Sequence, residues 1–179
     1  MVDLQFLVIN NTNEEISMGM QYSFHSFDRD IKYDAISATA NTGGFTPLTS
    51  IARYYRWDSK IINKASKQCN DRKEIAVLNN LSPMLLMVPQ TRGQNNDSFL
   101  ISDLLNACSA TKTKILRFTH YCFIQNRIPE KEIEIILNYI KDKSEQSGLD
   151  TIIWDIDSRH KNQLAEIYKK VFENDCSFI

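Results

Sequence analysis

The sequence predicts one α/β domain, residues 1–179, in which helices cover both faces of a mixed, mostly parallel sheet. Three observations support this three-layer α/β/α fold. Short apolar runs of strand length alternate with amphipathic helical patterns from one end of the chain to the other, which is typical of α/β proteins. A chain of 179 residues is long enough for one sizeable core. No internal repeat, low-complexity run or linker divides it.

The predicted strands are apolar runs that suit a sheet covered on both faces. One contains Ile31, Ala35, Ile36 and Ala38, and another ends where Pro89 stops it. The full set spans residues 4–9, 23–27, 31–38, 74–78, 84–88, 114–123 and 151–156.

The predicted helices have an apolar stripe at helical spacing, usually after a capping residue. The clearest begins at Pro129, carries glutamates in its first turn and lysines near its end, and stops at Gly148. The others begin at Glu14, at Pro47, at Asp58 or Ser59, at Asp97 or Ser98, and at Asp157 or Ser158.

A strand, a glycine turn and a helix start follow one another over residues 30–53. Gly43 and Gly44 break the strand, Thr46 can cap the next helix, and Pro47 suits its first position. A helix N-terminus after a glycine turn favours anions, and ligands of open parallel sheets sit at the carboxyl ends of strands. The pattern therefore predicts either an anion site or a tight turn without a ligand.

Composition narrows the class of protein. The net charge is −1 and no long basic run occurs, so we expect no non-specific binding to nucleic acid. The four cysteines form no C-x-x-C pair, and we expect them to be reduced and packed. Neither a signal peptide nor a long apolar span is present, which predicts a cytoplasmic protein with no membrane partner. We expect no metal and no cofactor.

The order of the predicted elements and two motifs resemble those of macrodomains, the ADP-ribose-binding α/β modules. The run Asp34-Ala35-Ile36-Ser37-Ala38-Thr39-Ala40-Asn41 matches the family's Asp-Ala-Ile-Val-Asn-Ala-Ala-Asn strand. Before it, Arg29-Asp30-Ile31 stands where the family has Gly-Asp-Ile at the end of a strand. The strand predicted over residues 114–123 and the segment before Pro129 stand where the family has a strand and its second phosphate loop. The strand predicted over residues 151–156 and the last helix, with Tyr168, stand where the family has its final strand and helix.

The resemblance implies roles for individual residues. Asp30 would accept the adenine amino group, and Ile31 would pack beside the ring. Asn41 would contact the distal ribose and is the candidate catalytic residue, while Gly43 and Gly44 would present backbone N–H groups. The second loop would complete the pocket with His120, Tyr121, Phe123, Asn126 and Arg127.

The sequence also departs from the family pattern. Ala38 replaces the first Asn, and no glycine occurs between Thr119 and Pro129, where Tyr121, Ile124 and other bulky residues stand instead. A side chain at each position limits how closely a diphosphate approaches the backbone. Three consequences remain open: a different ligand, side-chain contacts from Asn126 and Arg127 in place of backbone ones, or loss of binding.

Two functions follow. The first is binding of ADP-ribose or a related adenine nucleotide, with hydrolysis of an ADP-ribosyl group as a subordinate version and an ADP-ribosylated protein as the partner. The alternative is a degenerate member of the same fold that serves as an interaction or structural module without a nucleotide pocket. A cavity of about 300 Å³ or more at the carboxyl ends of the central strands would distinguish them.

Overall fold

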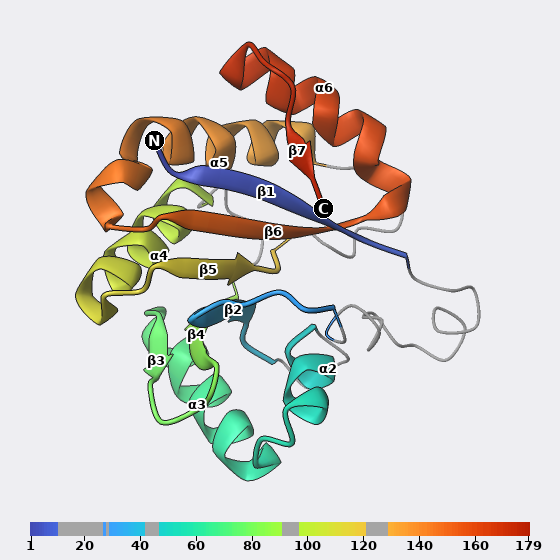
Figure 1. The fold of residues 1–179 in the computed structure, drawn as a ribbon. Coiled ribbons are helices and arrows are strands. Elements are labelled where there is room, and N and C mark those ends of the chain that lie inside the picture. The colour runs from blue at the N-terminus through green and yellow to red at the C-terminus, as the bar shows by residue number, and fades with distance from the viewer. Residues whose placement is uncertain (11–26, 28, 42–46, 91–96, 121–128) are drawn as a thin grey trace.

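A computed structural model of the chain describes residues 1–10, 27, 29–41, 47–90, 97–120 and 129–179. In this part of the chain seven strands form one sheet, and five α-helices cover it (Figure 1). The strand order is β3 (Ala76–Leu78), β4 (Met84–Val88), β2 (Ala35–Thr39), β5 (Ile115–Phe118), β6 (Thr151–Asp157), β1 (Asp3–Ile9) and β7 (Ser177–Phe178). Only the β3–β4 pair is antiparallel among these strands. The mixed, mostly parallel sheet predicted from the sequence is therefore confirmed.

The helices divide into two layers on opposite faces of the sheet. On one face, α4 (Asp97–Thr111), α5 (Glu130–Lys143) and α6 (Lys161–Phe172) bury their apolar sides against β1, β4, β5 and β6. On the other face, α2 (Pro47–Tyr54) and α3 (Ser59–Arg72) pack on β2 and β4. Alternate residues of a strand point to opposite faces, so Leu86 joins the first core and Leu85 the second. The predicted three-layer arrangement is thus confirmed.

Local signals account for the helix ends. Asp58 caps α3 by accepting the N–H of Lys60 at 2.8 Å, as an N-cap side chain does. After α5 the chain makes a short 3₁₀ turn, η2 (Ser144–Ser147), and stops at Gly148 in the left-handed conformation, φ 76°. The predicted cap at Asp58 and the predicted stop at Gly148 are both confirmed.

Several predicted strand limits are wrong. The strand expected over residues 31–38 begins only at Ala35, because the Asp34 carboxylate accepts the N–H groups of Lys114 and Ile115 at 2.8 Å and turns the chain there. β5 ends at Phe118 rather than at residue 123, and the predicted set lacks the two-residue strand β7. The helix expected from Glu14 and most of the strand expected over 23–27 lie outside the described residues. No helix in the described ranges has the length and apolarity needed to span a membrane.

Candidate functional site

The carboxyl ends of the parallel strands meet at one edge of the sheet, and the chain leaves two neighbouring strands there in opposite directions. After β2 it enters α2 and α3 on one face, and after β5 it enters α5 on the other face. Because β2 and β5 are adjacent, this divergence creates the crevice in which open α/β sheets bind their ligands. Sheet topology therefore places the candidate site between the ends of β2 and β5.

His120 and Thr39 lie together at this point. The Thr39 hydroxyl is 3.2 Å from His120 Nδ1, and this contact joins the end of β2 to the end of β5. The His120 ring stacks on Phe118 with centroids 5.7 Å apart, and its backbone carbonyl accepts the indole N–H of Trp154 at 2.6 Å. Desolvation by burial lowers the pKa of His120 to about 4, so the ring is neutral at pH 7 and offers a hydrogen bond rather than a charge.

Asn41 follows β2 directly and contacts both helices of its layer. Its backbone N–H donates to the Ser66 hydroxyl of α3 at 3.2 Å, and its Oδ1 accepts the Thr49 hydroxyl of α2 at 3.4 Å. The residue is half-buried. The structure thus brings the candidate catalytic residue and His120 to the same edge of the sheet.

Asp157 and Arg159 form an ion pair at the same edge of the sheet, where β6 ends. Asp157 accepts the backbone N–H of Arg159 at 2.9 Å and caps the 3₁₀ helix η3 (Ser158–His160). Its carboxylate also holds the Arg159 guanidinium with contacts of 2.9 and 2.8 Å, and these hydrogen bonds raise the pKa of Arg159. Asp157 therefore acts as the predicted helix cap, and its charge is balanced locally.

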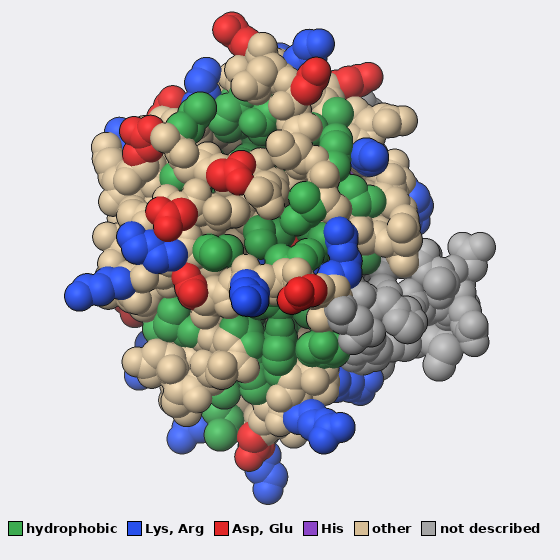
Figure 2. Space-filling model, viewed as in Figure 1, with side chains coloured by type: hydrophobic (Ala, Val, Ile, Leu, Met, Phe, Trp, Pro, Cys, Tyr) green, Lys and Arg blue, Asp and Glu red, His purple; other side chains and the backbone are tan. Residues whose placement is uncertain are grey.

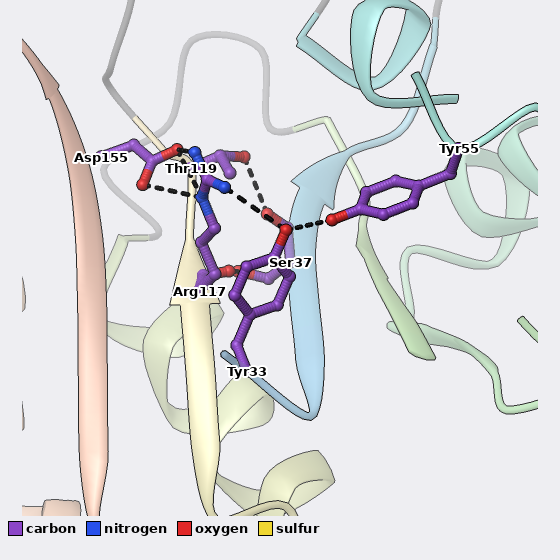
Figure 3. Close-up of polar contacts among 6 residues, drawn as sticks. All are labelled: Tyr33, Ser37, Tyr55, Arg117, Thr119 and Asp155. Carbon is purple, nitrogen blue, oxygen red and sulfur yellow. Dashed lines mark hydrogen bonds and ion pairs between the residues drawn. The ribbon is translucent and has the colours of Figure 1, made fainter. Parts of the chain in front are cut away.

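A network of buried polar side chains lies on the α2–α3 side of the sheet. Figure 3 shows Arg117 of β5 reaching Asp155 of β6 on one side and the Tyr33 hydroxyl on the other. Arg117 Nη2 and Asp155 Oδ2 are 2.8 Å apart, with side chains 1% and 0% exposed. Burial raises the pKa of Asp155 well above its usual range, and the adjacent Arg117 guanidinium opposes this shift because a cation favours the charged carboxylate.

Aromatic side chains connect this polar network to the end of α2. The Tyr33 hydroxyl bonds the Tyr55 hydroxyl (Figure 3), and the Arg117 guanidinium lies 4.4 Å from the centroid of the Phe27 ring. Tyr55 in turn stacks on Trp57. The aromatic residues at and after the end of α2 are therefore packed against their neighbours.

Asp30 and Ile31 do not lie with Asn41 and His120, which corrects the single pocket predicted from the sequence. Ile31 lines a cavity of about 580 Å³ together with Asp34 and Met84, the residues at the amino ends of β2 and β4. Asp30 is exposed beside it. Asn41 lies beyond the opposite end of β2, about 20 Å of extended chain from Asp34. The two groups of residues therefore occupy opposite ends of the strand.

The remaining predicted site residues lie outside the described part of the chain. These are Gly43, Gly44, Tyr121, Phe123, Asn126 and Arg127. Two of the described thiols are buried: burial raises the pKa of Cys69 to about 11 and that of Cys108 to about 12. Both stay protonated at neutral pH and are core residues, as predicted. The described residues include no cluster of three metal-ligating side chains.

Sequence reasoning missed several residues at this edge. The motif gives Thr39 no role, and the resemblance assigns the adenine contact to Asp30 rather than to Asn10, which directly follows β1. The order of the strands could have revealed Asn10, since β1 is the described strand that precedes β2. Asn70 and Gln90 lie 29 and 50 residues from the backbone carbonyls that they contact, and no local pattern marks them.

Charges on the face drawn in Figure 2 are mixed. Lysine and arginine side chains alternate with acidic ones over the described surface, and neither sign dominates this view. The picture agrees with the net charge of −1.

Comparisons with known proteins support the fold. No protein-family model matches the sequence, and no curated protein matches it. Among solved structures, a mutant macrodomain of Oceanobacillus iheyensis with ADPR is similar, with a TM-score of 0.60 and 12% identity over 94% of this chain and 93% of that chain. A Trypanosoma brucei macrodomain gives 0.58 and 16% over 79% of this chain and 62% of its own. The macrodomain of Thermus aquaticus DarG gives 0.52 and 10% over 86% and 98%.

The structural similarity extends over most of this chain, but sequence identities of 10%, 12% and 16% are evidence for the fold alone. The mixed sheet and its helices match the macrodomain α/β/α architecture, although the sequence has diverged far from these proteins. The chain therefore has the macrodomain fold, in a divergent form.

Proposed function

We propose that this protein binds ADP-ribose or a related adenine nucleotide at the carboxyl edge of its sheet, in the crevice between β2 and β5. The observation that carries the proposal is the divergence of the chain between these adjacent strands, because ligands of open α/β sheets occupy that position. The fold adds support, since similar macrodomains have been solved with ADPR and with ADP.

The described residues supply suitable chemistry for a sugar and a base. Asn41, Thr39 and neutral His120 offer hydrogen-bonding groups suited to ribose hydroxyls. Asn10 follows β1 at the same edge, in the place that the resemblance gave to Asp30, and its amide can pair with the edge of an adenine ring. The resemblance assigns the rest of the pocket to residues outside the described part of the chain, namely Gly43, Gly44, Tyr121, Phe123, Asn126 and Arg127.

Isothermal titration with ADP-ribose tests the proposal when two matched variants are compared. In Asn41→Asp the carboxylate can still accept the Thr49 hydroxyl, but it adds a negative charge near the expected diphosphate. A unit charge about 5 Å away costs on the order of 3 kcal/mol at an effective dielectric constant near 20, so we expect at least tenfold weaker binding. Asp30→Asn removes an exposed charge at the other end of the strand and should leave the affinity unchanged.

Three further outcomes are informative. Asn10→Ala should weaken ADP-ribose and reduce the preference for ADP over GDP, which would place the base near β1. Weaker binding in Asp30→Asn but not in Asn41→Asp would move the site to the amino end of the sheet. An absence of heat at millimolar ADP-ribose would refute the proposal in favour of an interaction module without a nucleotide pocket.

Binding to an ADP-ribosylated protein and hydrolysis of the ADP-ribosyl group are finer versions of the same proposal. Hydrolysis would require Asn41 to orient the distal ribose or a water molecule. Incubation with an ADP-ribosylated peptide separates the two: capture without release of ADP-ribose means recognition, and release that Asn41→Asp abolishes means turnover.

A further inference from the structure

One side chain of α3 contacts the chain segments that follow two adjacent strands, β2, which borders the proposed site, and β4. Asn70 donates from Nδ2 to the backbone carbonyl of Asn41, just past β2, at 3.2 Å. Its Oδ1 accepts the backbone N–H of Gln90, just past β4, at 2.9 Å. A carbonyl needs a donor and an N–H needs an acceptor, so these two contacts also fix the orientation of the Asn70 amide.

Two further hydrogen bonds hold the backbone next to this amide. The Gln90 side chain donates from Nε2 to the carbonyl of Ala40 at 3.1 Å. Ser66, one helical turn before Asn70 and 2% exposed, accepts the N–H of Asn41. The backbone of residues 40–41 is therefore held by three side chains, two of them from α3.

α3 is firmly attached to the sheet at this point. Cys69, directly before Asn70, is 2% exposed, and its thiol donates to the carbonyls of Glu74 and Met87 at 3.1 and 3.5 Å. Ile62 and Ser66 bury the same side of the helix. Asn70 consequently projects from a helix whose neighbouring side chains are buried against the sheet.

We propose that Asn70 is a positioning residue that holds Asn41 and Gln90 in register and thereby prepares the mouth of the site for its ligand. The inference rests on the proposed function, because it assigns Asn70 to the same site. A preformed mouth removes the conformational entropy that binding would otherwise cost. Loss of this support should therefore weaken ligand binding even though Asn70 is a helix residue behind the crevice.

The experiment compares three substitutions in α3. Asn70→Leu keeps the approximate shape and removes both hydrogen bonds. Asn70→Asp keeps the acceptor for Gln90 and loses the donor to Asn41. Asn63→Leu is the matched control, since Asn63 is exposed on the same helix. Each variant is measured by amide hydrogen exchange and by titration with ADP-ribose.

The expected pattern differs between the two measurements. In Asn70→Leu the Gln90 amide should exchange at least tenfold faster and ADP-ribose should bind about five- to tenfold more weakly, the scale of one lost hydrogen bond. Asn70→Asp should keep the Gln90 amide protected yet bind as weakly as Asn70→Leu, because the donor to Asn41 is lost. Asn63→Leu should change neither quantity.

Two results would overturn the inference. One is wild-type affinity in Asn70→Leu, and the other is unchanged protection of the Gln90 amide in that variant. If the wild-type protein itself takes no ADP-ribose, the proposed function fails first. In that case the positioning role is judged on exchange alone: protection that survives in Asn70→Leu refutes it, and protection lost there but kept in Asn70→Asp supports it.

Discussion

His120, whose side chain is half-buried, has a pH dependence that can be measured in solution. Its pKa is lowered to about 4 by desolvation, whereas an unfolded histidine titrates near 6.5. Between these values the unfolded chain binds more protons than the folded one, so stability rises with pH across that window. Well above pH 6.5 both states are neutral at this residue, and its contribution to stability no longer changes with pH.

We therefore expect a loss of stability in acid that depends on His120. Between pH 7 and pH 5 the wild-type protein should lose about 1 to 2 kcal/mol more than His120→Gln, since each pH unit below 6.5 contributes up to about 1.4 kcal/mol. Urea unfolding of both proteins at the two pH values measures the difference. Equal losses in the two proteins would mean that His120 is not desolvated.

A second residue-scale prediction concerns the pair Arg117 and Asp155. Removing one partner leaves the other charged and buried, which costs about 3 to 5 kcal/mol. Asp155→Asn and Arg117→Met should each destabilise the fold by roughly that amount. The double variant Arg117→Met/Asp155→Leu should cost less than either single change, because no charge is left buried.

Urea unfolding of the three variants provides the measurement. A double variant as unstable as the sum of the two single ones would contradict this reading, and would show that the Phe27 and Tyr33 contacts of the guanidinium dominate.

At the scale of elements, local chemistry made the helices predictable. α5 begins after Pro129, carries Glu130 and Glu132 in its first turn, and has Lys141 and Lys143 in its last turn. These signals lie within the helix itself, so the sequence alone locates it. β4 was likewise predicted at Met84–Val88, because Pro89 ends an unbroken apolar run.

Other elements depend on contacts that the sequence does not display. β5 ends at Phe118 although the apolar run continues to residue 123. Residues 31–34 look like a strand, yet the Asp34 carboxylate binds backbone groups 80 and 81 residues away and ends the extended segment. β7 has only two residues, too few to show any periodicity. Long-range hydrogen bonding by Asp34 thus accounts for the start of β2.

The stop at Gly148 gives a prediction at the same scale. Its φ of 76° lies in the left-handed region, and a Cβ there would meet nothing within 4 Å. Gly148→Ala should therefore cost about 1 kcal/mol from backbone strain alone, and Gly148→Asn should cost less, since Asn tolerates this conformation better. Thermal unfolding ranks the three proteins. An alanine variant as stable as the wild type would show that the turn relaxes without cost.

At the scale of the whole molecule, the order of strands determines which predicted residues can act together. The sequence motif placed Asn41 correctly at the carboxyl edge, because a strand and the residue after it are adjacent in the chain. It misplaced Asp30, because three matched residues gave no information on which end of the sheet they occupy. The partners of Asn41 on α3 follow only from the folded arrangement.

The central claim is that an adenine nucleotide binds at the carboxyl edge of the sheet, between β2 and β5. Its most direct test is a titration of ¹⁵N-labelled protein with ADP-ribose, followed by the backbone amide signals. We expect the amides of Asn10, Asn41 and His120 to shift with a common saturation curve, while those of Asp34 and Met84 stay in place. Shifts confined to Asp34 and Met84, or no shifts at millimolar ADP-ribose, would contradict the claim.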